Sequence, residues 1–260
     1  MLAAQRQTAI LERVRKDGAV RVRALVREFG VSDMTIRRDL EALSHRGLLA
    51  KVHGGATSSD APATDEPGSA AKSLRQADEK ELIAARAAQL VQPGAAVGLS
   101  AGTTTWRLAH HLVDIPRLTI VTNSVPVADV LYRAGRPDQT VLLTGGVRTP
   151  SDALVGPFAV ATIRALNLDQ VFLGVHGMSA RHGFTTPNVL EAETDRALID
   201  AARHLIVLAD HTKWEAVGLS TIAPLSRAEV LVTDDVIGDD ARAVLAADVG
   251  DLIICAPRRR

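Results

Sequence analysis

VSDMTIRRDL, residues 31–40, has the apolar spacing of an amphipathic helix. At about 100° per residue, Ile36, Leu40 and the following Leu43 fall on one face and predict a buried stripe. The residues on the flanks of this stripe and on the opposite side are Met34, Thr35, Arg37 and Arg38. The two adjacent arginines are therefore expected at the exposed edge of a helix rather than in a core.

The neighbouring residues predict short elements on both sides of this helix. A helical pattern over about residues 5–16 is followed by a second one, which Gly30 can end in the left-handed conformation. Ser32 can then cap the third helix, and the turn-rich GLLAKVHGG at 47–55 predicts a small hairpin. Helix, tight turn and capped helix form the layout of a helix-turn-helix, whose second helix enters the major groove of DNA.

The helix that follows Ser32 is thus a candidate DNA-reading element. An arginine fork can bond guanine O6 and N7 or grip a phosphate, and the hairpin adds side chains that could touch the DNA backbone. The predicted DNA contacts are Ser32, Met34, Thr35, Arg37, Arg38, Lys51 and His53. The alternative is an ordinary solvated helix in which Asp33 pairs with Arg37, and Asp39 is another ion-pair partner.

The charge of the chain is unevenly distributed, although the net charge is zero. Residues 1–53 hold eleven Lys and Arg against six Asp and Glu, which gives +5 and leaves −5 for the remainder. A small basic N-terminal part followed by an acidic remainder is expected when one domain binds a polyanion such as DNA. The alternative is a chance distribution of surface charge.

Composition limits the class of protein. The chain has 260 residues, of which 47% are hydrophobic and 23% charged, which is ordinary for a soluble protein with one large domain and a small one. The single cysteine, Cys255, cannot form an intramolecular disulfide, and no apolar run approaches the roughly 18 residues needed to cross a bilayer. The N-terminus lacks the apolar centre of a signal peptide. These features predict a cytoplasmic protein without membrane contact.

The pattern changes in the second part of the chain. Residues 57–74, rich in Ser, Ala, Pro and Asp, predict a linker between a DNA-binding domain at 1–56 and a second domain at 75–260. In the second domain, β-rich runs alternate with helical stretches, which predicts an α/β fold with a mostly parallel sheet covered by helices. The expected strands are residues 95–100, 118–122, 140–144, 170–175, 204–209, 229–233 and 252–255.

Glycines and small hydrogen-bond donors follow several of these strands. Glycine lets the backbone come close to a ligand, and a helix N-terminus favours an anion. Because ligands of open α/β sheets bind at the carboxyl ends of the strands, we expect these loops to meet in one pocket. The predicted effector contacts are Gly102, Thr103, Thr104, Thr122, Asn123, Ser124, Gly145, Gly146, Glu191, Asp210 and Lys213. The set suits a phosphate that carries hydroxyl groups, although each loop could also be a plain helix cap.

Some charged residues in these loops allow two interpretations. Lys213 and Asp210 form either a surface ion pair or part of a phosphate site. Arg148 could equally bind a phosphate or be an ordinary surface charge. The loop histidines have a wider spacing than zinc ligands usually show, so no metal or other cofactor is expected. These histidines are His176, His182 and His211.

Two longer strings resemble a known family. ALVREFGVSDMTIRRDLEAL at 24–43 and RGLLAKVHGGA at 46–56 closely resemble the N-terminal winged helix-turn-helix of DeoR-family transcription regulators, with its V-S-x-x-T-I-R-R-D-L pattern and trailing H-G-G-A. GLSAGTTT, VTNS, TGG, FLGVHG, GFTTPN and LADHTK resemble the C-terminal effector domain of that family over about residues 75–235.

The resemblance implies a doubly wound α/β domain related to ribose-5-phosphate isomerase, which binds a phosphorylated sugar or polyol and forms a homo-oligomer, a dimer or tetramer. It also implies a repressor of carbohydrate or polyol catabolic genes that binds operator double-stranded DNA and is relieved by that effector.

The relationship to the isomerases makes a sugar-phosphate isomerase the main alternative function. Such an enzyme needs a carboxylate base beside the carbon acid of its substrate. The corresponding loop of the isomerases is rich in aspartate and glutamate, whereas residues 176–179 read His-Gly-Met-Ser. Glu191 and Glu193 on the following helix could reach the pocket, but we expect no catalytic residue. A scaffold without ligand is disfavoured by the Gly, Thr and Asn residues at the strand ends.

Overall fold

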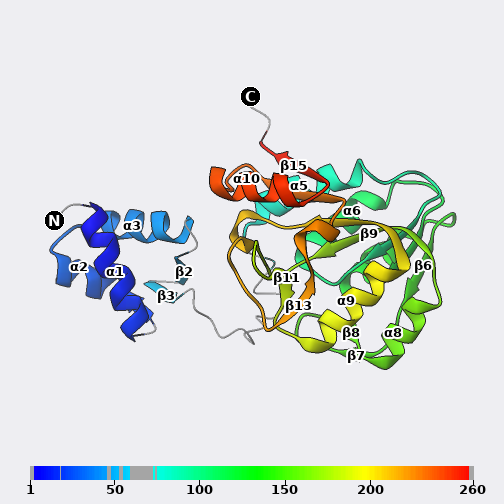
Figure 1. Ribbon diagram of the computed structural model, residues 1–260, viewed down its shortest axis with the longest axis horizontal. Coiled ribbons are helices and arrows are strands. Elements are labelled where there is room, and N and C mark those ends of the chain that lie inside the picture. The colour runs from blue at the N-terminus through cyan, green and yellow to red at the C-terminus, as the bar shows by residue number, and fades with distance from the viewer. Residues whose placement is uncertain are drawn as a thin grey trace. The chain divides into compact units, whose positions relative to one another are not determined.

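The computed structural model divides the chain into two compact units, Met1–Ala63 and Thr64–Arg260 (Figure 1). The structure describes residues 3–17, 19–45, 48–52, 55–58, 73 and 75–257. Most of the predicted linker, 59–72 and 74, therefore lies outside the described residues.

The N-terminal unit combines helices with a small antiparallel sheet. Its helices are α1 (Ala3–Asp17), α2 (Val22–Phe29) and α3 (Asp33–His45). Its strands are β1 (Ala19–Arg21), β2 (Leu49–Val52) and β3 (Gly55–Ser58), in the order β1-β3-β2. The predicted helix-turn-helix and hairpin are confirmed, with one shift: β3 continues to Ser58, two residues beyond the predicted domain border at 56.

The predicted stripe of α3 forms the core of this unit. Ile36, Leu40 and Leu43 are all at most 1% exposed, and they pack with residues of α1, α2 and the sheet. Gly30 ends α2 with φ 63°, the left-handed conformation that a side chain would disfavour, and its N–H donates to the carbonyl of Val26. The turn between the two helices thus has the predicted chemistry.

Asp39 forms a buried ion pair, whereas the alternative interpretation of α3 as a solvated helix treats it as a surface partner. It is only 4% exposed and accepts hydrogen bonds from Arg6 Nε at 2.5 Å and from Gln7 Nε2 at 3.2 Å. The side chain of Arg6 is itself only 9% exposed. This buried ion pair connects α1 to α3.

A seven-stranded parallel sheet forms the centre of the C-terminal unit. Its strands are β4 (Ala96–Leu99), β5 (Thr119–Thr122), β6 (Thr140–Leu143), β9 (Leu168–Gly174), β12 (Ala202–Leu208), β14 (Val230–Asp234) and β15 (Asp251–Cys255). They correspond to the seven predicted strands. The order β15-β14-β12-β9-β4-β5-β6 shows that the chain runs outward from β4 to β6 and then returns to β9 to run the other way. The fold is therefore doubly wound, with its switch point between β4 and β9.

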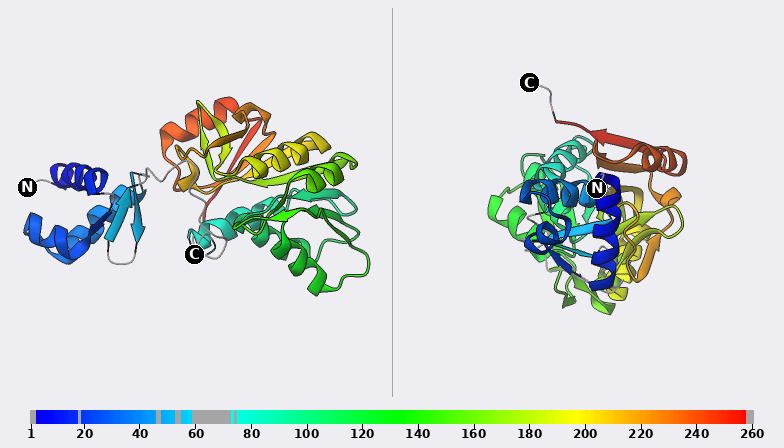
Figure 2. Two further views of the ribbon diagram at one scale, coloured as in Figure 1. Left: turned by 90° about the horizontal axis from the view of Figure 1, so that it is seen from below. Right: turned by 90° about the vertical axis from the view of Figure 1, so that its left-hand side faces the viewer.

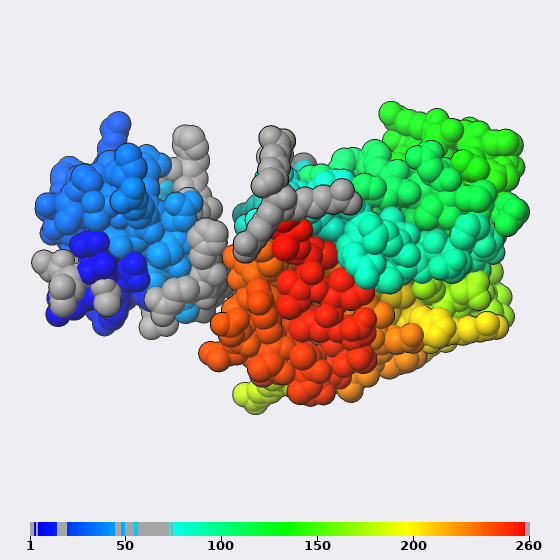
Figure 3. Space-filling view, turned by 90° about the horizontal axis from the view of Figure 1, so that it is seen from above, coloured from blue at the N-terminus to red at the C-terminus, as the bar shows by residue number. Residues whose placement is uncertain are grey.

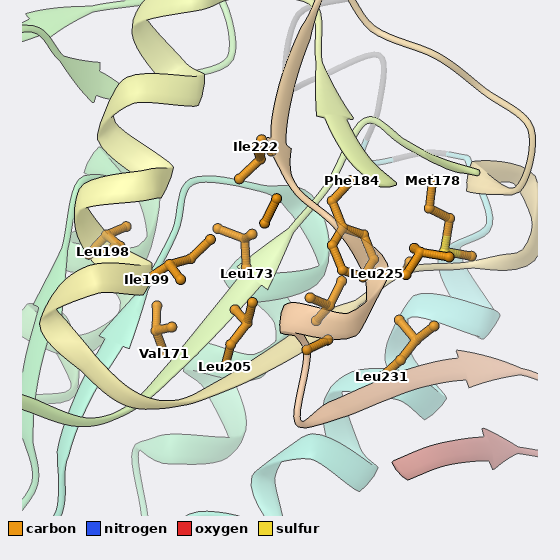
Figure 4. Close-up of a cluster of buried hydrophobic side chains, with 14 of the residues drawn as sticks. Val171, Leu173, Met178, Phe184, Leu198, Ile199, Leu205, Ile222, Leu225 and Leu231 are labelled. Carbon is orange, nitrogen blue, oxygen red and sulfur yellow. The ribbon is translucent and has the colours of Figure 1, made fainter. Parts of the chain in front are cut away.

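Helices cover both faces of this sheet (Figure 2). The helices are α5 (Ala77–Ala88), α6 (Thr103–Leu112), α7 (Val125–Ala134), α8 (Pro157–Arg164), α9 (Val189–Ala201) and α10 (Asp239–Asp248). Phe172 of β9 packs with α5, α6 and α7, whereas its neighbours Val171 and Leu173 point to the opposite face. There they lie beside Leu198 and Ile199 of α9 (Figure 4). The alternation of side chains along a strand explains the two cores.

Two small sheets, which the sequence did not predict, complete this unit. One contains β10 (Gly177–Ser179), β11 (Gly183–Thr186) and β13 (Ser220–Ala223), and the other β7 (Val147–Arg148) and β8 (Leu154–Val155). Two 3-10 turns, η1 (His211–Lys213) and η2 (Leu225–Arg227), follow β12 and β13. The last strand, β15, lies in the red region of Figure 3 and contacts α5. Across the described part of the chain, the helices are too short or too polar to cross a membrane.

Candidate functional site

The exposed side of α3 carries the predicted DNA contacts. Met34 is 64% exposed, and Arg37 and Arg38 are exposed as well. Ser32 caps the helix, because its Oγ accepts from the backbone N–H of Thr35 at 3.2 Å and lies 2.8 Å from Thr35 Oγ1. This side of the helix presents polar and basic groups to solvent.

The two arginines of α3 differ in their partners. Arg37 Nε donates to Asp33 one turn earlier, so the alternative of an i,i+4 ion pair holds for this residue. Among the described residues, Arg38 has no ion-pair partner. An exposed i,i+4 pair is weak, at about 0.3–0.5 kcal/mol, and leaves Arg37 available to exchange Asp33 for a phosphate.

The predicted contacts of the hairpin are only partly described. Lys51 lies in β2, in register with Ala56 of β3. His53 lies outside the described residues.

A pocket of about 80 Å³ opens at the switch point of the large sheet. It is formed by the segments that follow β4, β5, β9 and β12, together with residues of α5 and α9. Six predicted effector contacts line it: Gly102, Thr103, Thr104, Asn123, Glu191 and Lys213. The structure thus brings these six residues together in one pocket, and their contact with an effector stays a prediction.

The start of α6 forms one wall of the pocket. Gly102, Thr103 and Thr104 line it, so the positive end of the helix dipole is available to an anion. Asn123 holds this loop in place, since its Oδ1 accepts from the N–H of Ala101 at 2.9 Å and its Nδ2 donates to the carbonyl of Leu154 at 3.2 Å.

Two lysines contribute positive charge to the pocket. Lys213 ends the 3-10 turn η1 after β12, and Lys80 reaches the pocket from α5. Lys80 is only 3% exposed, and its Nζ donates to the carbonyl of Arg75 at 2.7 Å. Burial lowers the pKa of Lys80 to about 8, against the opposing attraction of Asp210, and the positive charges of Lys213, Arg107 and Arg75 lower it further.

Two carboxyl groups of α9, Glu191 and Asp195, also line the pocket. Glu191 accepts hydrogen bonds from the hydroxyl of Thr149 at 2.8 Å and from that of Thr186 at 3.3 Å. Asp195 is 7% exposed, and burial raises its pKa well above the usual value, with the negative charge of Glu191 as the second cause.

Five predicted effector residues lie outside the lining of this pocket: Thr122, Ser124, Gly145, Gly146 and Asp210. Thr122 donates to the carbonyl of Leu99 at 2.8 Å, and Ser124 caps α7. Gly146 has φ 120°, and a Cβ there would lie 2.5 Å from the carbonyl oxygen of Val155. Backbone geometry thus explains this glycine without a ligand.

Asp210 and Arg148 have structural partners of their own. Asp210 is 1% exposed and caps η1, accepting from the N–H of Thr212 at 3.0 Å, so it shapes the loop that carries Lys213. Arg148 pairs with Asp152 at 2.5 Å on the surface and does not line the pocket, which favours the surface charge among its two interpretations.

The three loop histidines have separate environments. His176 lines the pocket, whereas the backbone N–H of His182 donates to Ser179 Oγ at 3.2 Å. His211 Nδ1 lies 2.8 Å from Asp234 Oδ1. In the part of the chain that the structure describes, no three His, Cys, Asp or Glu residues are grouped so that they could hold a metal ion.

Sequence reasoning missed several residues of the pocket: Lys80, Ser151, Thr186 and Asp195. A signal for two of them was present. Lys80 stands three, four and seven positions before the buried Ile83, Ala84 and Ala87. Asp195 stands likewise between the buried Ala192 and Leu198 of α9. A charged residue on the apolar face of a helix is costly to bury, so it points to a special role.

Comparisons with known proteins cover both units. A family model described as "DeoR C terminal sensor domain" matches residues 75–235, and one described as "DeoR-like helix-turn-helix domain" matches residues 6–61. The chain is 36% identical to YgbI of Escherichia coli K12, an uncharacterized HTH-type transcriptional regulator, over 97% of this chain and 98% of that protein. It is 32% identical to the glycerol-3-phosphate regulon repressor of the same organism, over 90% and 92%.

Solved structures show a more distant likeness. Ribose 5-phosphate isomerase A from Methanocaldococcus jannaschii matches with a TM-score of 0.39 and 16% identity, over 53% of this chain and 54% of that chain. This likeness spans about half of each chain and supports no conclusion about activity.

Proposed function

The chain belongs to the DeoR family of DNA-binding transcription regulators, and we propose that it represses carbohydrate or polyol catabolic genes until a phosphorylated sugar or polyol binds. In this mechanism α3 binds operator DNA, and the pocket of the C-terminal unit binds the effector. The effector then shifts the protein away from its DNA-competent state.

The DNA-binding part of the proposal rests on the exposed side of α3. Ser32, Met34, Thr35, Arg37 and Arg38 would face the major groove, while Lys51 and His53 would contact the backbone from the hairpin. Arg38 is the strongest candidate for a base contact, because among the described residues its guanidinium has no ion-pair partner.

The effector-binding part rests on one observation: Lys80, Lys213 and the N-terminus of α6 line the same pocket. Two ammonium groups and a helix N-terminus suit a phosphate dianion, and the polar groups of Asn123 and Glu191 suit hydroxyls on the same molecule. The name of one relative, the glycerol-3-phosphate regulon repressor, agrees with an effector of this kind.

The assembly and the domain borders belong to the same proposal. Borders close to the predicted ones, with the first moved from 56 to Ser58 at the end of β3 and the second kept at 75, leave the DNA-binding and effector-binding parts separable. Self-association of the C-terminal part as a dimer or tetramer would place two copies of α3 on one operator, and the protein would act in the cytoplasm.

Selection from a random DNA library with the full chain tests the proposal. The selected DNA is labelled, and its release is followed by fluorescence anisotropy while a panel of sugar and polyol phosphates is added. The proposal expects specific binding, which Arg38→Ala weakens by about 1–3 kcal/mol, and release by at least one phosphorylated compound. Binding without sequence preference would contradict the DNA part, and no release by any compound would contradict the effector part.

A further inference from the structure

Asp195 is a buried acidic residue, and none of the described residues around it compensates for its burial with a hydrogen bond. It lines the pocket from α9 and is 7% exposed. Among the described residues it takes part in no hydrogen bond, although a buried polar group without a partner costs about 1–3 kcal/mol. A carboxyl group that is more than nine-tenths buried and borders an open pocket indicates a ligand group that completes its hydrogen bonds.

Glu191 extends this feature to a pair of carboxyl groups. It stands one helical turn before Asp195, so the two side chains are neighbours on the same face of α9. Thr149 and Thr186 hold its two carboxylate oxygens from two different segments of the chain. The position of Glu191 is therefore fixed before any ligand binds.

The pocket is lined from both faces of the large sheet. Lys80 enters it from α5, whose buried residues pack on one face, and the charge of Lys213 acts on Lys80. Glu191 and Asp195 enter it from α9, whose buried residues pack on the other face. The lysines and the carboxyl pair thus approach the pocket from different sides.

We propose, on the basis of the proposed function, that Asp195 and Glu191 bind a hydroxyl group at the end of the effector away from its phosphate. The effector is then a polyhydroxy phosphate, and Asp195 selects for its far hydroxyl.

The protonation of the pair explains why a hydroxyl fits better than other groups. Burial and the charge of Glu191 favour the protonated form of Asp195, so the pair combines a donor with an acceptor. A hydroxyl is also both donor and acceptor, and it satisfies the two carboxyl groups without changing their charge. A carboxylate in place of the hydroxyl would be repelled by the charge of Glu191, and an ammonium in its place would require both acids to ionise. A hydrogen atom in its place would leave Asp195 without a hydrogen-bond partner.

Calorimetry on the full chain tests this inference with matched ligands. The probes are orthophosphate and the linear polyol phosphates of three to six carbons, from glycerol 3-phosphate to glucitol 6-phosphate. Each polyol phosphate is compared with analogues whose far hydroxyl is replaced by hydrogen, by an amine or by a carboxylate. The variants are Asp195→Leu and Asp195→Asn, with Glu193→Gln as a control because Glu193 is an exposed acid on the same helix.

For the best-bound chain length, the wild type should bind the hydroxyl form at least about tenfold more tightly than the other three. Asp195→Leu should reduce this preference to less than about threefold while orthophosphate binding stays within about twofold. Asp195→Asn, which can still donate and accept, should keep part of the preference, and Glu193→Gln should keep all of it. If Asp195→Leu does not fold, the wild-type series and Asp195→Asn decide the question.

Equal or tighter wild-type binding of any analogue would overturn the inference, as would an undiminished preference in Asp195→Leu. If orthophosphate binds without any preference for a hydroxyl, this inference fails and the proposed phosphate site stands. If neither orthophosphate nor any polyol phosphate binds, both fail.

Discussion

Replacing Lys80 by methionine should stabilise the C-terminal unit and weaken its binding of phosphate. Methionine has a similar length and no charge, so it removes the buried ammonium and leaves the packing of α5 against α6 in place. The pKa of Lys80 is lowered from 10.5 to about 8, chiefly by burial. Since one pKa unit corresponds to about 1.4 kcal/mol, the protonated lysine costs the folded unit on the order of 3 kcal/mol at neutral pH.

The net gain in stability from Lys80→Met should be smaller than the cost of burying the charge. Methionine loses the hydrogen bond to the carbonyl of Arg75, worth about 1 kcal/mol, and leaves Asp210 with a weaker positive field. We therefore expect a gain of about 1–2 kcal/mol, or a rise in melting temperature of roughly 2–8 °C for a unit of this size. Affinity for orthophosphate should fall at least about tenfold, because a charge-assisted contact is lost.

The dependence on pH gives this prediction a signature of its own. Between about pH 8 and 10.5 the unfolded chain holds a proton on Lys80 that the folded chain has released, so the stability of the wild type rises with pH there. The advantage of methionine should shrink over the same range. Thermal unfolding of wild type, Lys80→Met and the control Lys213→Met at several pH values measures it. A Lys80→Met variant that is less stable at pH 7 and binds phosphate normally would refute the reasoning, since Lys80 would then be a structural tie to Arg75.

Three further predictions concern other parts of the chain. Asp39→Ala should destabilise the N-terminal unit by about 3–5 kcal/mol, because it leaves the buried Arg6 without its partner, and a loss below about 1 kcal/mol in chemical denaturation would contradict the buried pair. Burial lowers the pKa of His211, but the hydrogen bond and charge of Asp234 outweigh burial and raise the pKa above 6.5. The protonated His211 therefore stabilises the folded C-terminal unit below pH 6.5, and this contribution declines as the pH rises through the raised pKa. Asp234→Asn should flatten that decline above pH 6.5, and an unchanged slope would exclude His211 as its source. Limited proteolysis should cut first within 57–74, and a first cut within the large sheet would contradict the proposed domain borders.

The sequence predicted the elements of both units well because their patterns are local. The stripe of Ile36, Leu40 and Leu43 has the helical period, and the strands of the large sheet are short apolar runs between helical stretches. Three strands of the small sheets were not predicted because they are very short. β7 and β8 have two residues each, and β10 has three.

The pocket was harder to predict because it depends on contacts between distant residues. Loops after parallel strands meet at one edge of a sheet, so the lining by Gly102, Asn123 and Lys213 followed from position alone. Lys80 and Asp195 enter the same pocket from helices on opposite faces of the sheet, and no local pattern states which face a helix will cover. The burial of Asp39 could not be predicted for a similar reason, since its partner Arg6 lies 33 residues away.

The central claim is that a phosphorylated metabolite in the pocket of the C-terminal unit controls DNA binding by the N-terminal unit. The most direct measurement is a titration of the full chain, bound to its selected DNA, with the best compound of the sugar and polyol phosphate panel, in the wild type and in Lys213→Ala. The account predicts that the wild type releases the DNA, whereas Lys213→Ala binds the DNA with unchanged affinity and needs at least about tenfold more of the compound for release. A Lys213→Ala variant that releases its DNA at the wild-type concentration, or that loses DNA binding while it keeps normal affinity for the compound, would contradict it.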